Sequence, residues 1–223
     1  MIPNDNLPDL AADLVRIHTV ISRGLAVGLE KGAEFQRTGF PDLATRAGFA
    51  DYLLALTVVL AAHHLGEDEV AFPALRARLP SIPYERLAAD HQKAAALIDP
   101  LRQALNQLSG EGKTAGLVLL VEGLSRLSEL WGPHIAVEEQ YFSRPALAEV
   151  MDMDEQGRLS AALGKHNQEH ATPGYLALPF VLFNLEGRER AAMAAAMPEM
   201  VTGRLIPTVW KEQWAPMKPF LLD

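Results

Sequence analysis

Residues 63–75 of the chain read HHLGEDEVAFPAL, which places two histidines and three acidic residues within a strongly apolar sequence. The apolar run YLLALTVVLAA, residues 52–62, comes directly before it. His63 and Glu67 are four residues apart, so on a helix their side chains share one face. Two interpretations are open. The pair can stabilise a solvated helix face, or it can supply two ligands to one metal centre.

The same pattern occurs a second time. In each copy a single histidine is followed, 45 residues later in the first copy and 43 in the second, by a histidine that begins H-x-x-x-E. The second copy, residues 134–147, reads HIAVEEQYFSRPAL and ends in the same way as the first. The repeat favours ligands over a solvated face. The candidate metal ligands are His18, His63, Glu67, His91, His134 and Glu138.

Apolar residues recur at helical spacing over four long segments, separated by glycine and proline. The composition is 49% hydrophobic and only 7% aromatic, which favours helices packed on helices. The sequence therefore predicts an all-α protein. We expect helices from Leu7 to about Ala33, from about Leu43 to Arg78 with an interruption at Pro73, from Ser81 to Leu108 with a kink at Pro100, and from the GEGKT turn (110–114) to about Met151 with a bend at Gly132–Pro133.

Residues 152–223 differ from the rest because six prolines divide them. We expect short helices here, docked on the preceding part of the chain by Trp210, Trp214 and Phe220. No low-complexity linker separates the two parts. The predicted organisation is a four-helix domain, residues 1–151, followed by a helical extension, residues 152–223, that packs on it.

Antiparallel packing of consecutive helices would bring the candidate ligands together. His18 and His63 lie at similar distances from the turn between their helices, and so do His91 and His134. Four histidines and two glutamates can then converge in the bundle interior, where facing helices build metal sites. Burial of such groups is costly unless they are paired or metal-bound, so their apolar flanks support a metal site.

The ligand types restrict the metal. Imidazole with carboxylate suits iron, zinc or manganese, and two carboxylates can bridge two ions. Dinuclear iron is the natural proposal. Ferritin-like di-iron bundles use E-x-x-H, but none of the seven histidines has an acid three residues before it, so that class is disfavoured.

The motif HH-x-x-E-D followed by F-P-x-L is similar to the second-helix signature of the hemerythrin-like (HHE cation-binding) family. The resemblance covers about residues 8–150. It implies an antiparallel up-down-up-down four-helix bundle around two non-haem iron ions bridged by carboxylates and an oxo or hydroxo group. On this basis His18 and His63 hold one iron, His91 and His134 hold the other, and Glu67 and Glu138 bridge them.

The sequence departs from the oxygen-carrying members, which have H-x-x-x-H on the third helix. The position four residues after His91 is Ala95. Each iron would then keep two histidines and open positions for water, oxygen, peroxide or nitric oxide, which disfavours reversible oxygen carriage. His64 is either a further ligand or a residue that lies behind the ligands or is partly exposed, and the second interpretation is favoured. Asp68 and Glu139 either hydrogen-bond the ligand imidazoles or lie on a solvated face.

Other notable residues have simpler interpretations. The segment KHNQEH, residues 165–170, contains His166 and His170, which we expect on a polar surface turn rather than at the metal. Trp131 and Tyr141 are expected to pack in the core.

Composition excludes several classes of function. The net charge of −8 disfavours nucleic-acid and anionic-membrane partners. Because the chain has no cysteine, it has no disulfide, no cysteine-ligated metal and no thiol nucleophile. The N-terminus shows no signal peptide and the apolar runs are too short to span a bilayer, so we expect a cytoplasmic protein.

The predicted function is a di-iron protein that binds or reacts with a small oxidant in redox response or sensing. No side chain suggests a positioned nucleophile or general base, so any activity, such as weak peroxide decomposition or oxidase chemistry, would depend on the metal. The alternative is a regulatory or protein-interaction module in which the metal is mainly structural.

Overall fold

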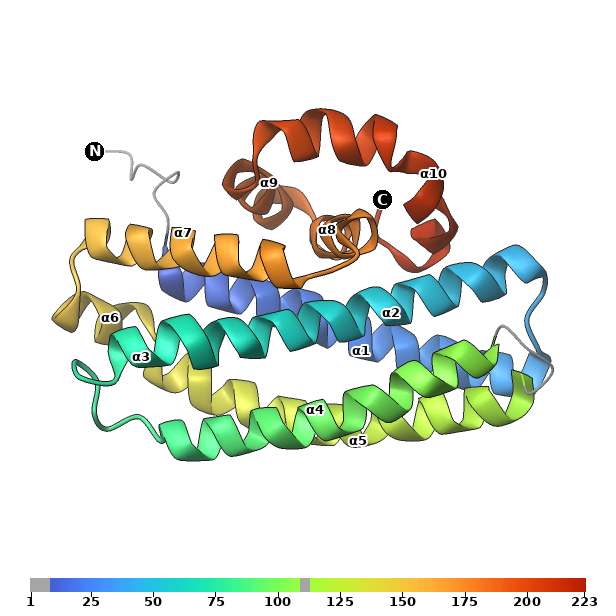
Figure 1. Cartoon of the computed structure of the whole chain (residues 1–223), viewed down its shortest axis with the longest axis horizontal. Coiled ribbons are helices and arrows are strands. Elements are labelled where there is room, and N and C mark those ends of the chain that lie inside the picture. The colour runs from blue at the N-terminus through green and yellow to red at the C-terminus, as the bar shows by residue number, and fades with distance from the viewer. Residues whose placement is uncertain (1–8, 109–112) are drawn as a thin grey trace.

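The structure, a computed structural model, describes residues 9–108 and 113–223. All regular secondary structure within these ranges is helical, which confirms the predicted all-α class. In Figure 1, α1 and α4 run in one direction while α2 and α5 run in the other, and each of α1 and α4 packs against both α2 and α5. The four long helices are α1 (Leu10–Thr38), α2 (Leu43–Gly66), α4 (Tyr84–Leu108) and α5 (Lys113–Tyr141).

Helix α1 is longer at its C-terminal end than predicted. Its N-cap is Asp9, whose carboxylate accepts a hydrogen bond from the Ala12 amide at 3.1 Å. The expected start at Leu7 lies outside the described residues. The helix runs through Gly32 and past Ala33 to Thr38. A Cβ at Gly32 would lie 2.6 Å from a Val121 methyl on α5, so the glycine lets the two helices approach closely.

The second long helix contains an irregular turn. After α2 the chain continues through the π-helical turn η1 (Glu67–Ala71) into α3 (Phe72–Leu75), and ends before the predicted Arg78. Pro73 cannot donate a backbone hydrogen bond, and its ring would clash with a regular helical carbonyl four residues earlier. The wider turn of η1 accommodates this proline. As a result, Glu67 stands at the first position of the irregular turn.

The prediction of one helix to about Met151 was wrong. Helix α5 ends at Tyr141, and a separate helix, α6 (Arg144–Val150), follows. Pro145 is at the start of α6, where its missing N–H costs nothing. Inside a continuous helix the same ring would clash with the carbonyl of Tyr141. The third helix ends at Leu108 as predicted and contains Pro100, while most of the GEGKT turn falls outside the described residues.

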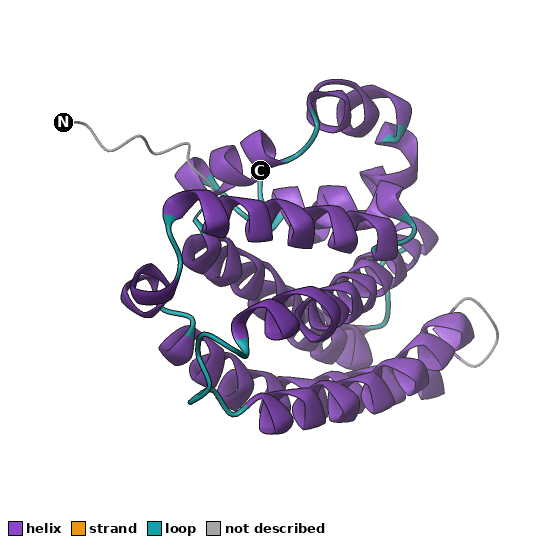
Figure 2. Ribbon diagram, turned by 60° about the vertical axis from the view of Figure 1, so that its left-hand side comes forward, coloured by secondary structure: helices purple, strands orange, loops and turns teal. Residues whose placement is uncertain are grey.

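The chain after α6 packs against α1 and α2. Figures 1 and 2 show α7 lying along the long helices, with the remaining elements stacked above them. At 18 residues, α7 is longer than the short pieces expected, because the first proline of this region is at position 173. These elements are α7 (Met153–His170), α8 (Gly174–Phe183), α9 (Gly187–Ala196), η2 (Val201–Val209), α10 (Lys211–Trp214) and η3 (Ala215–Phe220).

The C-terminal segment is held by both apolar and polar contacts. Phe220 is buried, and its ring centroid lies 5.4 Å from that of Phe49 and 5.7 Å from that of Tyr52. The Tyr52 hydroxyl donates a hydrogen bond to Oδ1 of Asn184 at 2.8 Å, and Arg23 donates to the Phe220 carbonyl at 2.9 Å. The half-buried Arg23 guanidinium thus gains a hydrogen bond to the main chain of the segment when the segment is docked.

One apolar stretch, Leu43–Leu75, is long enough to cross a membrane by length and composition. However, 56% of its most apolar window is buried inside the protein. It packs on α1 and α4 and also on α7, α8 and η3. It is therefore the central core helix of this fold.

Candidate metal centre

All six predicted ligands lie in the interior between the four long helices. Each has an exposed fraction of 4% or less. Two helices give one histidine each, while the α2–η1 segment and α5 each give a histidine and a glutamate. The residues by element are His18 on α1, His63 on α2, Glu67 on η1, His91 on α4, and His134 and Glu138 on α5.

The ligand atoms form two groups that share both carboxylates. Within each group the imidazole nitrogens and carboxylate oxygens lie within 4.8 Å of one another. The groups are His18 with His63, Glu67 and Glu138, and His91 with His134, Glu67 and Glu138. This grouping has the form that the sequence predicts for two ions bridged by two glutamates.

Glu138 lies between the two groups with one oxygen toward each. Its Oε2 is 3.2 Å from Nε2 of His18. Its Oε1 is 3.2 Å from Nε2 of His134 and 3.7 Å from Nε2 of His91. The side chain has an exposed fraction of 0%, so water does not screen these contacts. A carboxylate divided in this way can bind one cation with each oxygen.

Glu67 also faces both groups, through a single oxygen. Its Oε2 is 3.5 Å from Nε2 of His63 and 3.4 Å from Nε2 of His91. Because η1 begins at this residue, the irregular turn sets the position from which the carboxylate reaches the centre. Such π-helical turns inside α-helices are frequent at functional sites.

The atoms that face one another form no hydrogen bond with any part of the chain that the structure describes, although all are buried. They are Nε2 of His18, His63, His91 and His134, Oε2 of Glu67, and both carboxylate oxygens of Glu138. Nearly all buried polar atoms in native proteins have a partner. Imidazole nitrogens and carboxylate oxygens are ligands of iron, zinc and manganese. The residues present therefore fit a pair of bound cations.

Two further acids fix the orientation of the ligand histidines. Nδ1 of His18 lies 2.9 Å from Oε1 of Glu139, and Nδ1 of His91 lies 2.9 Å from Oδ1 of Asp68. Of the two alternatives for these acids, hydrogen bonding to ligand imidazoles is the one observed. When the neutral ring donates from Nδ1, the lone pair is on Nε2 and points at the centre. Each acid directly follows a glutamate of the centre and reaches a histidine on a different helix.

Removal of one of these acids should weaken metal binding without removing a ligand. We expect Asp68→Ala to lower metal affinity by about 10–100-fold, the usual effect of losing a partner of a ligand histidine. Asp68→Asn keeps an oxygen acceptor for the His91 Nδ1–H and should lose less. Competition with a chelator measures both. Equal losses in the two variants would mean that the negative charge, not the hydrogen bond, is what matters.

The pKa values of the central groups show the electrostatic cost of bringing them together. Burial, and then the charge of Glu138, raises the pKa of Glu67 well above its usual value. Burial alone would raise the pKa of Glu138, but the nearby His134, His18 and His91 outweigh burial and hold it well below the usual range. Burial lowers the pKa of His63 far below 6.5, so its ring is neutral. A cation would allow both carboxylates to be ionised.

A comparison with known protein families matches residues 9–146 to the hemerythrin HHE cation binding domain. The chain belongs to this hemerythrin family. The match spans α1 to the beginning of α6 and includes all six residues of the centre. No match was found among curated proteins or among solved structures. The family supports a cation-binding role for the two groups of residues.

His64 is a fifth histidine at the centre of this hemerythrin-family chain. It is buried, with an exposed fraction of 6%, so it lies against the ligand histidines and is not partly exposed. It forms a group with His91 and His134, and its ring stacks on His91 at 4.1 Å between centroids. Burial, followed by the charges of His91 and His63, lowers its pKa well below the usual value. In the sequence, the second histidine of the HH pair is the feature that could indicate a further histidine at the centre.

Trp131 packs in the core, as predicted, and forms one wall of the hemerythrin-like centre. Its ring centroid is 5.4 Å from that of His18 and 6.0 Å from that of His63. The indole N–H donates a hydrogen bond to the Ser22 hydroxyl at 2.8 Å, which orients the ring. The apolar face excludes water next to the ligand histidines, and its fluorescence offers a local reporter of metal binding.

His166 and His170 do not join the centre. His170 is exposed, and its Nδ1 contacts the His166 carbonyl. The His166 ring contacts Glu69 on η1, with Nε2 3.0 Å from Oε2. His166 thus lies on a surface helix, with a polar contact that ties α7 to the turn that carries Glu67. Neither histidine belongs to a potential metal group among the described residues.

Replacement of the α7 histidines should leave the metal in place. We expect His166→Ala and His170→Ala, alone or together, to keep full iron content, because neither Nε2 faces the centre. His91→Ala should lose iron, because α4 has Ala95 at the position of a second ligand. The measurement is iron content of the purified variants beside their thermal unfolding curves. Iron loss from a folded double α7 variant would place α7 in the active centre.

Proposed function

We propose that this chain is a non-haem di-iron protein that binds or reacts with a small oxidant. The observation that carries the proposal is the set of buried, unpaired nitrogen and oxygen atoms in two groups that share Glu67 and Glu138. One ion would be held by His18 and His63, the other by His91 and His134, in an antiparallel up-down-up-down bundle. Two metal ions bridged by these carboxylates would account for the burial of both side chains.

Iron is favoured by the chemistry of the donors. All are imidazole nitrogens or carboxylate oxygens, and the chain offers no cysteine sulfur. Zinc and manganese share these donors, but structural zinc sites in proteins are almost always four-coordinate and tetrahedral, often with cysteine ligands. Two ions bridged by carboxylates are the usual arrangement of dinuclear iron and manganese centres. Metal analysis after expression with each metal distinguishes them.

The ligand count supports binding of an external molecule. Each proposed ion has two histidines and shared carboxylates, and Ala95 removes a further ligand from α4. His64 is placed to add a third imidazole on the side of His91 and His134. The bound iron pair would supply redox and ligand-binding chemistry toward oxygen, peroxide or nitric oxide. Asp68 and Glu139 would fix the tautomers of His91 and His18 by hydrogen bonds. Trp131 would shield one side of the centre from water.

We also propose the cellular setting and the division of labour in the chain. Residues 1–151 would form the metal-binding unit, and residues 152–223 an extension that packs on it. The net charge of −8 supports a protein without nucleic-acid or membrane partners, acting in redox response or sensing in the cytoplasm. The extension covers α2, the helix that supplies two histidines at the centre.

The as-purified protein tests the proposal through its iron content and near-ultraviolet spectrum. We expect about two iron ions per chain, with an absorption that changes on addition of peroxide or nitric oxide. The metal-free protein provides the baseline. A bound metal whose spectrum does not change with either peroxide or nitric oxide would support the alternative in which the metal is structural. Binding of a single ion would contradict the dinuclear assignment.

A further inference from the structure

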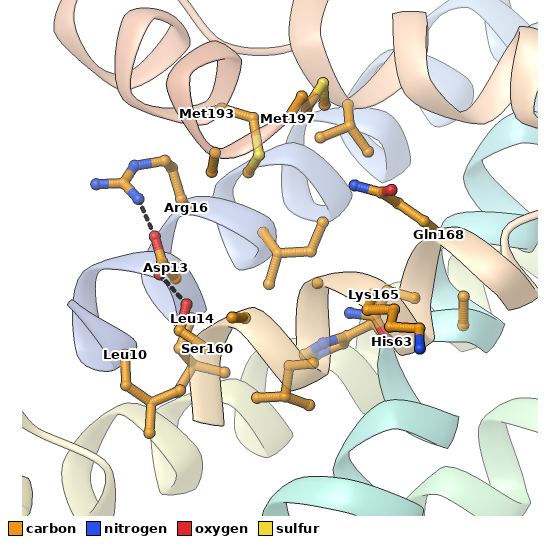
Figure 3. Close-up of a pocket in the computed structure, with 18 of the residues that line it drawn as sticks. Leu10, Asp13, Leu14, Arg16, His63, Ser160, Lys165, Gln168, Met193 and Met197 are labelled. Atoms are coloured by element: carbon orange, nitrogen blue, oxygen red, sulfur yellow. Dashed lines mark hydrogen bonds and ion pairs between the residues drawn. The ribbon is translucent and has the colours of Figure 1, made fainter. Parts of the chain in front are cut away.

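A large cavity lies between the long helices and the C-terminal extension, next to the metal centre. Its volume is about 770 Å³, within the range of small-molecule sites. Figure 3 shows its walls, which come from α1, α2, α7 and α9, with α8 also contributing. Helices α7, α8 and α9 lie beyond residue 146, where the family match ends. The cavity is therefore a feature of how this chain's extension packs.

The wall of the cavity is mainly aliphatic. Leucine, isoleucine, valine, alanine and methionine side chains from α1, α2, α7, α8 and α9 form most of it, and Phe142 is the one aromatic side chain among the described lining residues. Examples are Leu14, Ile17, Leu163, Val181, Met193 and Met197. Methionine and leucine side chains adapt to flexible chains, while a planar ring system would be expected to meet more aromatic wall.

Polar groups line the cavity in three regions, around Asp9 and Asp13, around His63 and Glu67, and along α7, where Lys165, Asn167 and Gln168 lie. Asp13 is already paired with Arg16 and Ser160, so this group needs no ligand. At the inner end the cavity reaches His63 and Glu67 of the metal centre. On α7, Lys165 lines the cavity with a side chain that is 79% exposed, which places it at an opening. Its nearest acid, Glu169, is 3.9 Å away, so the ammonium is only weakly paired.

We propose that this cavity binds an amphipathic aliphatic molecule with a carboxylate head. The aliphatic chain lies among Leu14, Leu163 and Met193, and its far end points toward His63 and Glu67. The carboxylate lies at the opening, where Lys165 supplies a positive charge and the Gln168 amide a hydrogen-bond donor. A phosphate head is disfavoured, because the cavity has no glycine-rich loop among its described residues and, at this opening, the single positive charge of Lys165 does not balance a doubly charged group.

Binding of aliphatic chains requires no metal, so the proposal is independent of the iron assignment. It would nevertheless place an organic molecule beside the centre, which would make the extension a determinant of what reaches the metal. The proposed di-iron function and the proposed ligand site can each be contradicted without the other. A protein that takes up no iron when iron is supplied, but binds the ligand, contradicts only the function proposed above. A protein that takes up iron but does not bind the ligand contradicts only this inference.

Calorimetric titration with decanoate and with decanol, on metal-free and on iron-loaded protein, tests the proposal. Saturable decanoate binding is expected in both forms, with decanol binding more weakly. Ala192→Phe places a ring in the cavity and should weaken decanoate binding about tenfold or more. The matched control is Ala191→Phe, an exposed position on the same helix that does not line this cavity, which should leave the affinity unchanged.

Two further variants keep the test decisive. Gly164 lines the cavity, and a Cβ added there would meet no atom within 4 Å, so Gly164→Leu fills the cavity from α7 if Ala192→Phe fails to fold. Lys165→Met should reduce decanoate affinity to that of decanol and leave decanol unchanged. Absence of saturable binding to the wild-type protein, or full affinity in a folded cavity-filled variant, would overturn the proposal. Decanol binding as tight as decanoate would overturn the carboxylate assignment.

Discussion

Glu138→Ala is expected to reduce the iron content from about two ions per chain to nearly none. The two oxygens of this carboxylate face opposite groups of histidines, at 3.2 Å from His18 and from His134. Its loss removes a ligand from both ions at once, so neither site should survive alone. Glu67→Ala should have the same effect, because one of its oxygens lies near both His63 and His91.

The control for this prediction is Glu122→Ala, which removes an exposed acid from the same helix and should keep full iron content. The metal-free Glu67→Ala variant should unfold at a temperature no lower than the metal-free parent, because burial and the charge of Glu138 oppose the ionisation of Glu67. Iron analysis measures the metal content, and thermal unfolding measures the stability of the metal-free proteins. Full iron in both glutamate variants, or loss of one ion only, would sink the bridging assignment.

The local part of this site could be predicted from the sequence. The spacing of His63 to Glu67 and of His134 to Glu138 requires only helical periodicity, and the structure places both pairs in the buried centre. The repeat of a lone histidine before each pair gave His18 and His91. These inferences depend on separations along a single helix or on the similar lengths of paired helices, which a sequence shows directly.

The features that the sequence did not reveal depend on contacts between distant segments. The pairing of Asp68 with His91 crosses from η1 to α4, so two interpretations of that acid were equally consistent with the sequence. Burial of His64 follows from its position against His91, not from its neighbours in sequence. The end of α5 at Tyr141 does not follow from the prolines alone, because the helix accommodates Pro133 but is interrupted before Pro145. The cavity exists only because the extension packs on α1 and α2.

Docking of the C-terminal segment depends on a single glycine of α2. A Cβ at Gly48 would lie 1.8 Å from the backbone carbonyl oxygen of Pro216 and 2.5 Å from its carbon. Backbone atoms of η3 cannot move aside as the end of a flexible side chain could. Any larger residue must therefore push η3 away from α2, which would expose Phe220 and separate Arg23 from the Phe220 carbonyl.

We expect Gly48→Ala to lower the free energy of unfolding by roughly 2–3 kcal/mol, the range for overpacking in a filled core. This loss exceeds the gain of about 1 kcal/mol that alanine brings to a helix interior. The control is Gly132→Ala, where nothing lies within 4 Å of the added Cβ and only the gain should appear. Thermal unfolding gives the difference, and chymotrypsin cleavage after Phe220, which is buried while η3 is docked, reports release of η3. Because Gly48 lies about 20 Å along α2 from His63, the released protein should still bind its iron. Loss of iron together with release of η3 would show that the extension holds the metal centre in place, and an unchanged unfolding temperature would show that η3 is not docked as described.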